Sequence, residues 1–556
     1  MSDFGRLNRR TFLRMGALAA ATPAVAGLAA APVAADDDKG DKDNQGLHGK
    51  PDAGPFRELE EITIARLQAE MAAGKLTSRK LVDMYLKRID ALDKNGPKVN
   101  AILELNPDAR AIADALDAER KKTGPRGPLH GIPVLLKDNI DTHDKMQTGA
   151  GSLALVGTPA LQDATVAARL RAAGAVILGK TNLSEWANFR STHSSSGWSG
   201  RGGQCNNPFV LDRNPCGSSS GSGAAVSANL TVVSLGTETD GSIVCPATNN
   251  GVVGIKPTVG LVSRAGVVPI SHNQDTVGPH ARTVTDAAIT LGALVGLDPR
   301  DGATAASAGH FHTDYTPFLD PHALNGARIG VARKGVTGYS EKTDAIFEQA
   351  IAALRAAGAV IVDPADIPTM DEINSSNDET TVLLFDFKQD LNAYLATRVG
   401  VPIKTLADAI AFNNAHADQE MPWFGQELFI QAEATDGFGD PAYQQALAND
   451  KRRGGADGID AVLQQYHLDA LVAPTGAPAW TTDLVDGDHF LGASSTPAAI
   501  VGYPLVTVPA GFSHGLPVNI TFMGTAWSEP TLIKLAYAFE QATKIRRAPQ
   551  YLPSMP

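Results

Sequence analysis

The sequence predicts an α/β protein in which a largely parallel or mixed sheet is covered by helices on both faces. Short, continuous apolar runs such as residues 132–136 and 175–178 alternate with segments of helical periodicity. Strands buried on both faces have continuous apolar runs of this kind. No Pro/Gly-rich or charged linker splits the 556-residue chain, so the observations favour one large core.

The predicted elements begin with two amphipathic helices in residues 62–92, joined at residues 74–78. Ser78 is the candidate N-cap of the second helix. The remaining predicted elements are strands at 132–136, 175–178, 232–235, 252–255, 328–331, 470–472 and 505–508, helices at 165–173 and 532–543, and a helix followed by a strand within 343–361. Residues 300–325 are the most loop-like stretch.

Composition excludes several classes of protein. Apolar residues make up 43% of the chain and charged residues 19%, which excludes an intrinsically disordered protein. The formal net charge of −12 argues against a nucleic-acid partner, because phosphates are bound by Lys and Arg. Three cysteines cannot form a disulfide framework, and at least one of them stays unpaired.

The N-terminus is predicted to be an export signal. Arg9 and Arg10 precede Thr11-Phe12-Leu13, and an alanine-rich apolar run follows as far as Ala35. Prolines and a glycine interrupt this run, which argues against a membrane anchor. We expect residues 1–35 to be a twin-arginine signal cleaved near Asp36, residues 36–56 to be a flexible leader, and the mature protein to be periplasmic. Cleavage removes four arginines and one aspartate, so the net charge falls from −12 to about −15.

Two local motifs suggest chemistry but conflict with their surroundings. Residues 174–181 match the phosphate-binding pattern G-x-x-x-x-G-K-T, yet the residues between the glycines form a buried apolar strand rather than an anion-cradling turn. Residues 217–221 match the nucleophile elbow G-x-S-x-G around Ser219, yet a turn precedes them where an elbow requires a strand. We therefore favour neither motif.

Histidines do not indicate a metal centre. His310, His312 and His322 lack a partnering cluster, and no H-E-x-x-H motif occurs. The sequence therefore predicts an activity with no metal and no cofactor.

A third set of residues is distributed over three segments and is chemically stronger. Lys137 ends an apolar strand, where desolvation lowers the pKa of an ammonium group and favours a neutral amine that can act as a base. Residues 216–223 are rich in Gly and Ser, and residues 236–243 place Gly241 just before Ser242. A glycine-containing turn before a serine can direct backbone N–H groups at one point and form an oxyanion hole.

With these three segments in this order, the chain resembles the amidase signature family. The resemblance covers residues 57–545 and is strongest over residues 215–257. It implies one α/β domain over residues 57–556 with a large mixed sheet covered by helices. It also implies a Ser-cisSer-Lys triad, with Ser242 as nucleophile, Ser218 as the bridging serine 24 residues earlier, and Lys137 as base.

The mechanism that this resemblance implies runs through an acyl-enzyme. Ser242 loses its proton through Ser218 to neutral Lys137 and attacks the amide carbon. Backbone N–H groups of Thr239, Asp240, Gly241 and Ser242 are the candidates for the oxyanion hole. The resemblance further implies a cis peptide bond between Gly217 and Ser218.

Asp240 departs from the family pattern, in which a glycine usually occupies this position. A carboxylate near the site would raise the pKa of Lys137 unless it is turned away or paired. The peptide amidase branch, whose members release ammonia from C-terminal peptide carboxamides, is similar here. It is also similar at residues 181–190, 424–428 and 522–530, where Trp186, Phe189 and Trp527 are either core residues or subgroup markers.

Peptide carboxamide hydrolysis is therefore the predicted function, with a small-molecule or peptide amide as substrate. The first alternative is an amidase for small aliphatic or aryl amides. A transamidation subunit for tRNA-dependent synthesis conflicts with export, and a non-catalytic binding protein conflicts with the intact Lys137, Ser218 and Ser242. Oligomeric state and the spatial relation of Cys216 to Cys245, which flank the two serines in sequence, remain open at this stage.

Overall fold

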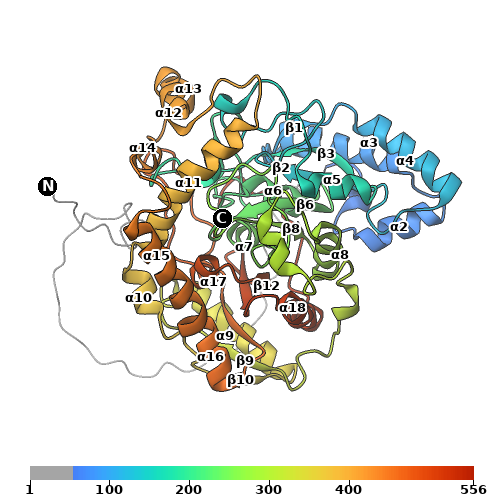
Figure 1. The fold of residues 1–556 in the computed structure, drawn as a ribbon. Coiled ribbons are helices and arrows are strands. Elements are labelled where there is room, and N and C mark those ends of the chain that lie inside the picture. Colours follow the sequence, from blue (N-terminus) through green and yellow to red (C-terminus); the bar gives the residue numbers. More distant parts are fainter. Residues whose placement is uncertain (1–53, 556) are drawn as a thin grey trace.

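The computed structural model describes residues 54–555, which form an α/β fold around an eleven-stranded sheet (Figure 1). The predicted export signal and nearly all of the predicted leader lie outside the described residues. No helix in residues 54–555 is both long and apolar enough to cross a membrane.

The sheet is mixed, as predicted. β2 is parallel to both of its neighbours, β3 and β6, and β9 is parallel to β10 and β11, whereas the remaining pairs are antiparallel. In spatial order the strands are β1 (Ile102–Leu105), β3 (Val176–Thr181), β2 (Pro133–Lys137), β6 (Val233–Glu238), β8 (Thr276–Ala281), β7 (Val253–Lys256), β12 (Leu505–Ser513), β13 (Leu516–Met523), β11 (Ala470–Pro474), β9 (Arg328–Val331) and β10 (Val360–Val362).

Helices surround this sheet, and Figure 1 shows α2, α3 and α4 on one side of the molecule and the helices of residues 370–466 on the other. The α-helices are α2 (Ile64–Ala72), α3 (Ser78–Arg88), α4 (Ala109–Thr123), α5 (Thr165–Ala172), α6 (Ser220–Ser227), α7 (Val244–Asn249), α8 (Val284–Leu294), α9 (Glu341–Ala356), α10 (Met370–Ser375), α11 (Asp378–Ala396), α12 (Leu406–Ala415), α13 (Ala417–Glu420), α14 (Glu427–Glu433), α15 (Pro441–Lys451), α16 (Asp460–Tyr466), α17 (Thr496–Val501) and α18 (Glu529–Thr543).

The predicted strands and helices are confirmed within a few residues, with one local correction. Thr77, not Ser78, is the N-cap of α3, because the Thr77 side chain accepts a hydrogen bond from the Lys80 amide. Ser78 is the first helical residue, and its hydroxyl donates to the carbonyl of Gly131 instead. Threonine is among the residues preferred at an N-cap, and the extended backbone of Thr77 places its hydroxyl to accept this bond.

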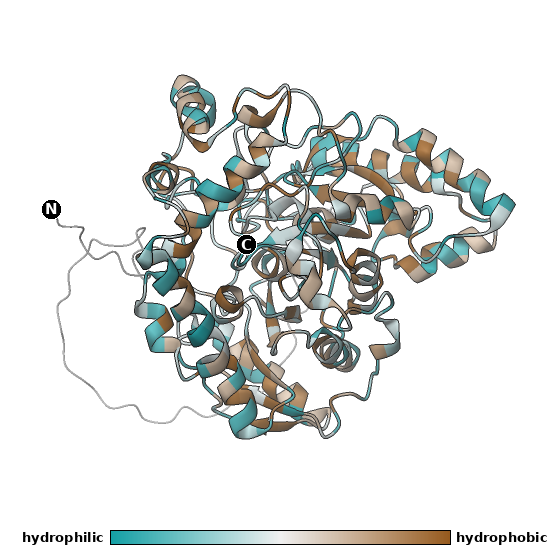
Figure 2. Cartoon of the chain, viewed as in Figure 1, coloured by the Kyte–Doolittle hydropathy of each residue, from teal (hydrophilic) through white to brown (hydrophobic). Residues whose placement is uncertain are grey.

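Burial explains why the sheet is stable. The central strands β2, β3, β6 and β7 are buried at every residue. Figure 2 shows apolar colour concentrated in the interior, while the outer helices carry hydrophilic residues as well. Removing apolar surface from water is the main favourable contribution to such a fold.

Parallel pairing of β2 with β6 creates the place for the functional site. Leu136 pairs with Leu235, so Lys137 at the end of β2 and the loop after β6 leave the sheet at the same edge. Helix α6, which follows the loop that carries Ser218, packs against both strands. Gly221 in its first turn has no room for a side chain, because a Cβ there would lie 2.2 Å from the carbonyl oxygen of Ala101.

A core substitution tests this packing. Phe522 in β13 is fully buried, and its ring centroid lies 6.3 Å from that of Phe539 in α18. Phe522→Ala is expected to lower the free energy of unfolding by about 3–5 kcal/mol, since it removes buried apolar surface and leaves a cavity. Equilibrium unfolding in guanidinium chloride measures the change. Val485→Ala, at a side chain that is 79% exposed, is the control and should change stability by less than about 0.5 kcal/mol. Equal effects of the two substitutions would contradict the packing described.

Candidate active site

Lys137 is completely buried at the end of β2 and makes three hydrogen bonds. Its Nζ donates to Ser218 Oγ at 2.7 Å, to Thr237 Oγ1 at 2.8 Å and to the carbonyl oxygen of Thr237 at 3.3 Å. Asn139 donates to the same Thr237 hydroxyl at 3.0 Å, which orients it. The structure thus brings the predicted base and the predicted bridging serine into direct contact.

Burial lowers the pKa of Lys137 to about 7, and the nearby carboxylates of Asp275 and Glu238 oppose this shift. The amine is therefore neutral in a large share of molecules near neutral pH. Asp240 is not among the groups that raise the pKa of Lys137. Its carboxylate instead accepts hydrogen bonds from Ser495 and Thr496 at the start of α17, so it is paired, as the sequence analysis required.

Ser218 is fixed by the chain on both sides. The Gly217–Ser218 peptide bond is cis, as the resemblance implied, and Ser218 is fully buried. The Ser218 carbonyl accepts the amide of Ser184 at 3.0 Å. Only glycine fits at position 217, since a Cβ there would lie 2.0 Å from the Ser184 hydroxyl. The hydroxyl of Ser218 is therefore held toward Lys137 by close packing.

Ser242 lies in the loop between β6 and α7 and is 8% exposed, in the wall of a cavity. Glu238 accepts the amides of Ile243 and Val244 at 2.7 and 2.9 Å, which holds the end of this loop. The Ser219 amide donates to the Ser242 carbonyl at 3.2 Å and links the two serine loops. Within residues 54–555 no hydrogen bond joins the hydroxyl of Ser218 to that of Ser242.

The three residues predicted for the oxyanion hole, Thr239, Asp240 and Gly241, line the same cavity as Ser242. Gly241 has a φ of +80°, a left-handed conformation that favours glycine at this bend. The Thr239 hydroxyl donates to Asp275 at 2.7 Å. Burial raises the pKa of Asp275 to about 6, while that hydrogen bond and two backbone amides oppose the rise. The loop is thus anchored at both ends next to the serine.

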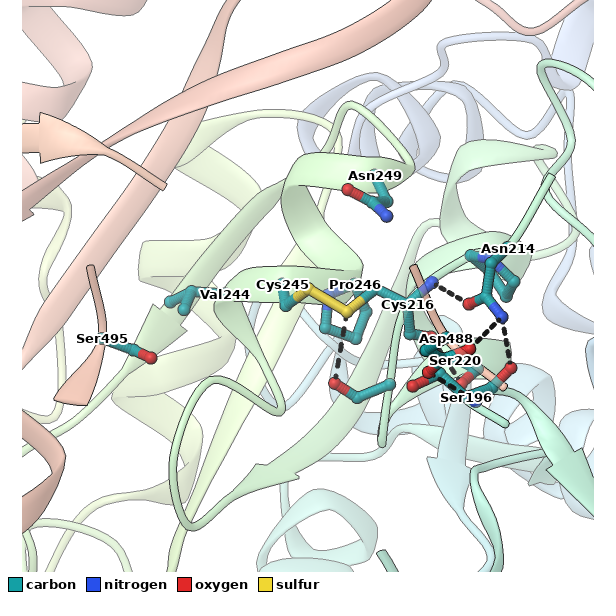
Figure 3. The surroundings of a disulfide bond; sticks show 12 residues. Ser196, Asn214, Cys216, Ser220, Val244, Cys245, Pro246, Asn249, Asp488 and Ser495 are labelled. Atoms are coloured by element: carbon teal, nitrogen blue, oxygen red, sulfur yellow. Dashed lines mark hydrogen bonds between the residues drawn. A yellow bond between two sulfur atoms is a disulfide. The ribbon is translucent and has the colours of Figure 1, made fainter. Parts of the chain in front are cut away.

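Cys216 and Cys245 form a disulfide with a Cα–Cα distance of 5.9 Å, which answers the question left open by the sequence (Figure 3). Both cysteines line the cavity. The Cys216 amide donates to Asn214 at 2.8 Å, and Asn214 in turn donates to Asp488 at 3.1 Å (Figure 3). Cys205 is the free cysteine and is buried in the apolar core.

The cavity has a volume of about 530 Å³, the size of a site for a small molecule or a chain end. The acidic residues in its wall are Asp240, Glu379, Asp486 and Asp488, and the lining residues include neither Lys nor Arg. Its apolar lining includes Phe189, Ile270, Leu383, Phe490 and Leu491. The wall therefore favours neutral or cationic groups over carboxylates.

Both competing motifs have structural explanations. In the G-x-x-x-x-G-K-T segment, Lys180 belongs to β3, is fully buried and donates to the carbonyl of Ile140 and to Thr148. Ser219 of the G-x-S-x-G match is fully buried and donates to the carbonyl of Thr237 at 3.0 Å, so it is not an exposed nucleophile. The two motifs are parts of the sheet and of the loop that hold Lys137 and Ser218.

Thr237 and Asp275 were not predicted as partners of the site, although Thr237 contacts Lys137 and Asp275 contacts Thr239. Thr237 lies inside the Gly236–Ile243 segment, so its place in that segment was a usable signal, whereas no motif in the sequence marks Asp275. Among the aromatic candidates, Phe189 lines the cavity. Trp186 packs against Phe429 at a centroid distance of 5.4 Å, and Trp527 stacks on His310 at 5.1 Å.

Comparisons with known proteins establish the family of the chain. The amidase family model matches residues 80–533. A probable amidase of Arabidopsis thaliana is 45% identical over 503 residues, covering 89% of this chain and 92% of that protein. Peptide amidase from Stenotrophomonas maltophilia superposes with a TM-score of 0.84 at 53% identity, covering 89% of this chain and 99% of that one.

A structure of peptide amidase in complex with the competitive inhibitor chymostatin superposes with a TM-score of 0.85 at 54% identity, covering 88% and 99% of the two chains. The family match extends over most of the chain, and the relatives are matched over nearly their whole length. The chain therefore belongs to the amidase family and is an amide-hydrolysing enzyme.

Proposed function

We propose that this enzyme hydrolyses the C-terminal carboxamides of peptides to the peptide acid and ammonia. The observation that carries the proposal is the buried hydrogen bond of 2.7 Å between Lys137 Nζ and Ser218 Oγ, beside the cavity that holds Ser242. In the neutral form of the amine, the Ser218 hydroxyl donates this bond to Nζ. The similarity to peptide amidase over nearly the whole of that chain supports the choice of substrate class.

In the proposed first step Lys137, as the neutral amine, takes the proton of Ser218, while Ser218 takes the proton of Ser242. Ser242 Oγ then forms a bond to the carboxamide carbon. This relay needs a hydrogen bond between the two serine hydroxyls that forms when substrate binds. Hydrogen bonds in active sites are often long without substrate and tighten in the complex.

The oxyanion of the tetrahedral intermediate is stabilised by backbone N–H groups of the loop from Thr239 to Ser242. Collapse of the intermediate breaks the C–N bond, and the proton held by Lys137 returns through Ser218 to the leaving nitrogen, which departs as ammonia. Water then attacks the acyl carbon and gives a proton to the same relay. The bond between the acyl carbon and Ser242 Oγ breaks, and the relay returns the proton to Ser242 Oγ as the peptide acid leaves.

The negative charge of the cavity wall is compatible with binding of the substrate and with release of the product. A carboxamide is neutral, so it enters a wall that carries Asp240, Glu379 and Asp488 without electrostatic cost. The product is a carboxylate and is repelled by the same groups. A site built for a carboxylate-bearing substrate would be expected to include Lys or Arg, which the lining residues do not.

A substrate panel tests the proposed function. The enzyme is expected to release ammonia from N-acyl dipeptide amides with a kcat/KM at least about tenfold above that for acetamide, propionamide and benzamide. Ser242→Ala, which removes the nucleophile, should lower kcat by roughly 10⁴-fold or more on every substrate. Ammonia release is measured directly, and Ser194→Ala, at another cavity serine, is the control. Equal or higher kcat/KM for the small amides would support the small-amide alternative, and an active Ser242→Ala would refute the nucleophile.

The pH dependence tests Lys137. Its pKa is lowered to about 7, so the fraction of neutral amine rises with pH, and kcat/KM should rise through about pH 7 and then level off. Lys137→Met should lower kcat by about 10²- to 10⁴-fold and remove this rise. Lys121→Met, at an exposed lysine of α4, is the control and should keep the wild-type profile. A kcat/KM that rises only near pH 10 would contradict a neutral Lys137.

Export through the twin-arginine route is a separate proposal. It is supported by Arg9 and Arg10 ahead of the apolar run, and by the disulfide, because disulfides persist in oxidising compartments such as the periplasm.

Mass spectrometry of the protein from a periplasmic fraction tests export. The mature chain is expected to start near Asp36, and changing Arg9 and Arg10 together to Lys should leave the uncleaved protein in the cytoplasm. Recovery of the chain with its first 35 residues intact from the periplasm or membrane would contradict the proposal.

A further inference from the structure

We propose that the Cys216–Cys245 disulfide positions the two serines of the active site, and that the enzyme reaches full activity only with this bond formed. The inference rests on the proposed roles of Ser218 and Ser242. It concerns the geometry between the two loops that carry them.

The disulfide joins the two segments close to the two serines. Cys216 lies two residues before Ser218, and Cys245 lies three residues after Ser242. The Cys216 carbonyl accepts a hydrogen bond from the hydroxyl of Ser220 at 2.6 Å, and this bond spans the turn that contains Ser218. The Cys245 amide donates to the Gly241 carbonyl at 2.8 Å, and this bond spans the turn that contains Ser242.

The noncovalent contacts between the two segments are hydrogen bonds, and two of them join the Ser219 hydroxyl to the backbone of Thr237. The Ser219 amide donates to the Ser242 carbonyl at 3.2 Å, and the Asn250 side chain donates to the Pro215 carbonyl at 2.9 Å. Each such bond contributes about 1 kcal/mol net. Without the disulfide these bonds keep the loops together, and the sheet is untouched, so we expect a folded enzyme in which the serines are less well aligned.

The disulfide is also part of the cavity wall, packed against Trp480 and Phe490. Asp488 connects two parts of this wall, because it accepts hydrogen bonds from Trp480 Nε1 and Asn214 Nδ2 at 3.1 Å each. Cys216 is therefore connected to Asp488 through Asn214, and to the Ser242 loop through sulfur (Figure 3). One covalent bond thus connects the substrate wall to both serine loops.

Opening the bond requires a reductant, and a small dithiol such as dithiothreitol supplies it. One thiolate attacks a cysteine sulfur, the S–S bond breaks and a mixed disulfide forms. The second thiolate of the reagent then displaces the protein thiolate, so two cysteine thiols are formed and the dithiol is oxidised to a cyclic disulfide. Cys205 lies in the core and takes no part in this exchange.

The test compares wild-type enzyme, oxidised and reduced, with the double variant Cys216→Ala/Cys245→Ala. Reduction and the double variant are each expected to lower kcat for a peptide amide by about 10- to 100-fold, because a displacement of roughly 1 Å at reacting groups costs about 100-fold. KM should change less than kcat. Dithiothreitol should have no further effect on the double variant, and reoxidation should restore the wild type. Cys205→Ala is the matched control and should keep the wild-type response to the reductant.

Two measurements separate positioning from a general loss of structure. Alkylation with mass detection counts the thiols opened, and far-UV circular dichroism with thermal unfolding gives the folded fraction. A fall in kcat in fully folded, reduced enzyme supports the proposal, also where the double variant does not fold. Full kcat in enzyme with both thiols alkylated or reduced would overturn it, and so would a fall in kcat that only follows the unfolded fraction. Ser242→Ala tests the proposed function separately, so failure of the two proposals is distinguishable.

Discussion

The rest of the site depends on the burial of the Lys137 amine. A charged ammonium without a partner costs several kcal/mol in the interior, and an ion pair with a carboxylate would keep it charged. This protein surrounds Nζ with a serine hydroxyl and both oxygens of Thr237, which are neutral groups. The parallel pairing of β2 and β6 is what makes this possible, because it brings the end of one strand beside the other.

The placement of Asp240 follows from the same constraint. A carboxylate two residues before Ser242 would stabilise the ammonium form if it faced Lys137. The hydroxyls of Ser495 and Thr496 donate hydrogen bonds to it instead. The start of α17, more than 250 residues away in sequence, therefore pairs a carboxylate that could otherwise raise the pKa of Lys137. The same hydrogen bonds join the C-terminal part of the chain to the loop that carries Ser242.

The sequence predicted the elements with strong periodicity and the residues with distinctive chemistry. Strand β2 and helix α5 were predicted almost to the residue. Thr239, Asp240, Gly241 and Ser242 line one cavity, and Lys137 contacts Ser218, which follows the cavity residue Gly217. Strand β8 was missed, because its Pro279 and Gly278 are uncommon in a central strand. Asp275 and the disulfide were beyond prediction for a different reason, since both depend on distances between segments that periodicity and local spacing do not specify.

Burial of Cys205 has a consequence for how the chain acquires its covalent structure. Desolvation raises the pKa of the Cys205 thiol well above its ordinary value, so the thiolate that drives disulfide exchange is scarce. Three cysteines allow three pairings, but once the core has formed only two of them can react. Burial of the third thiol therefore favours the Cys216–Cys245 pairing over the two alternatives.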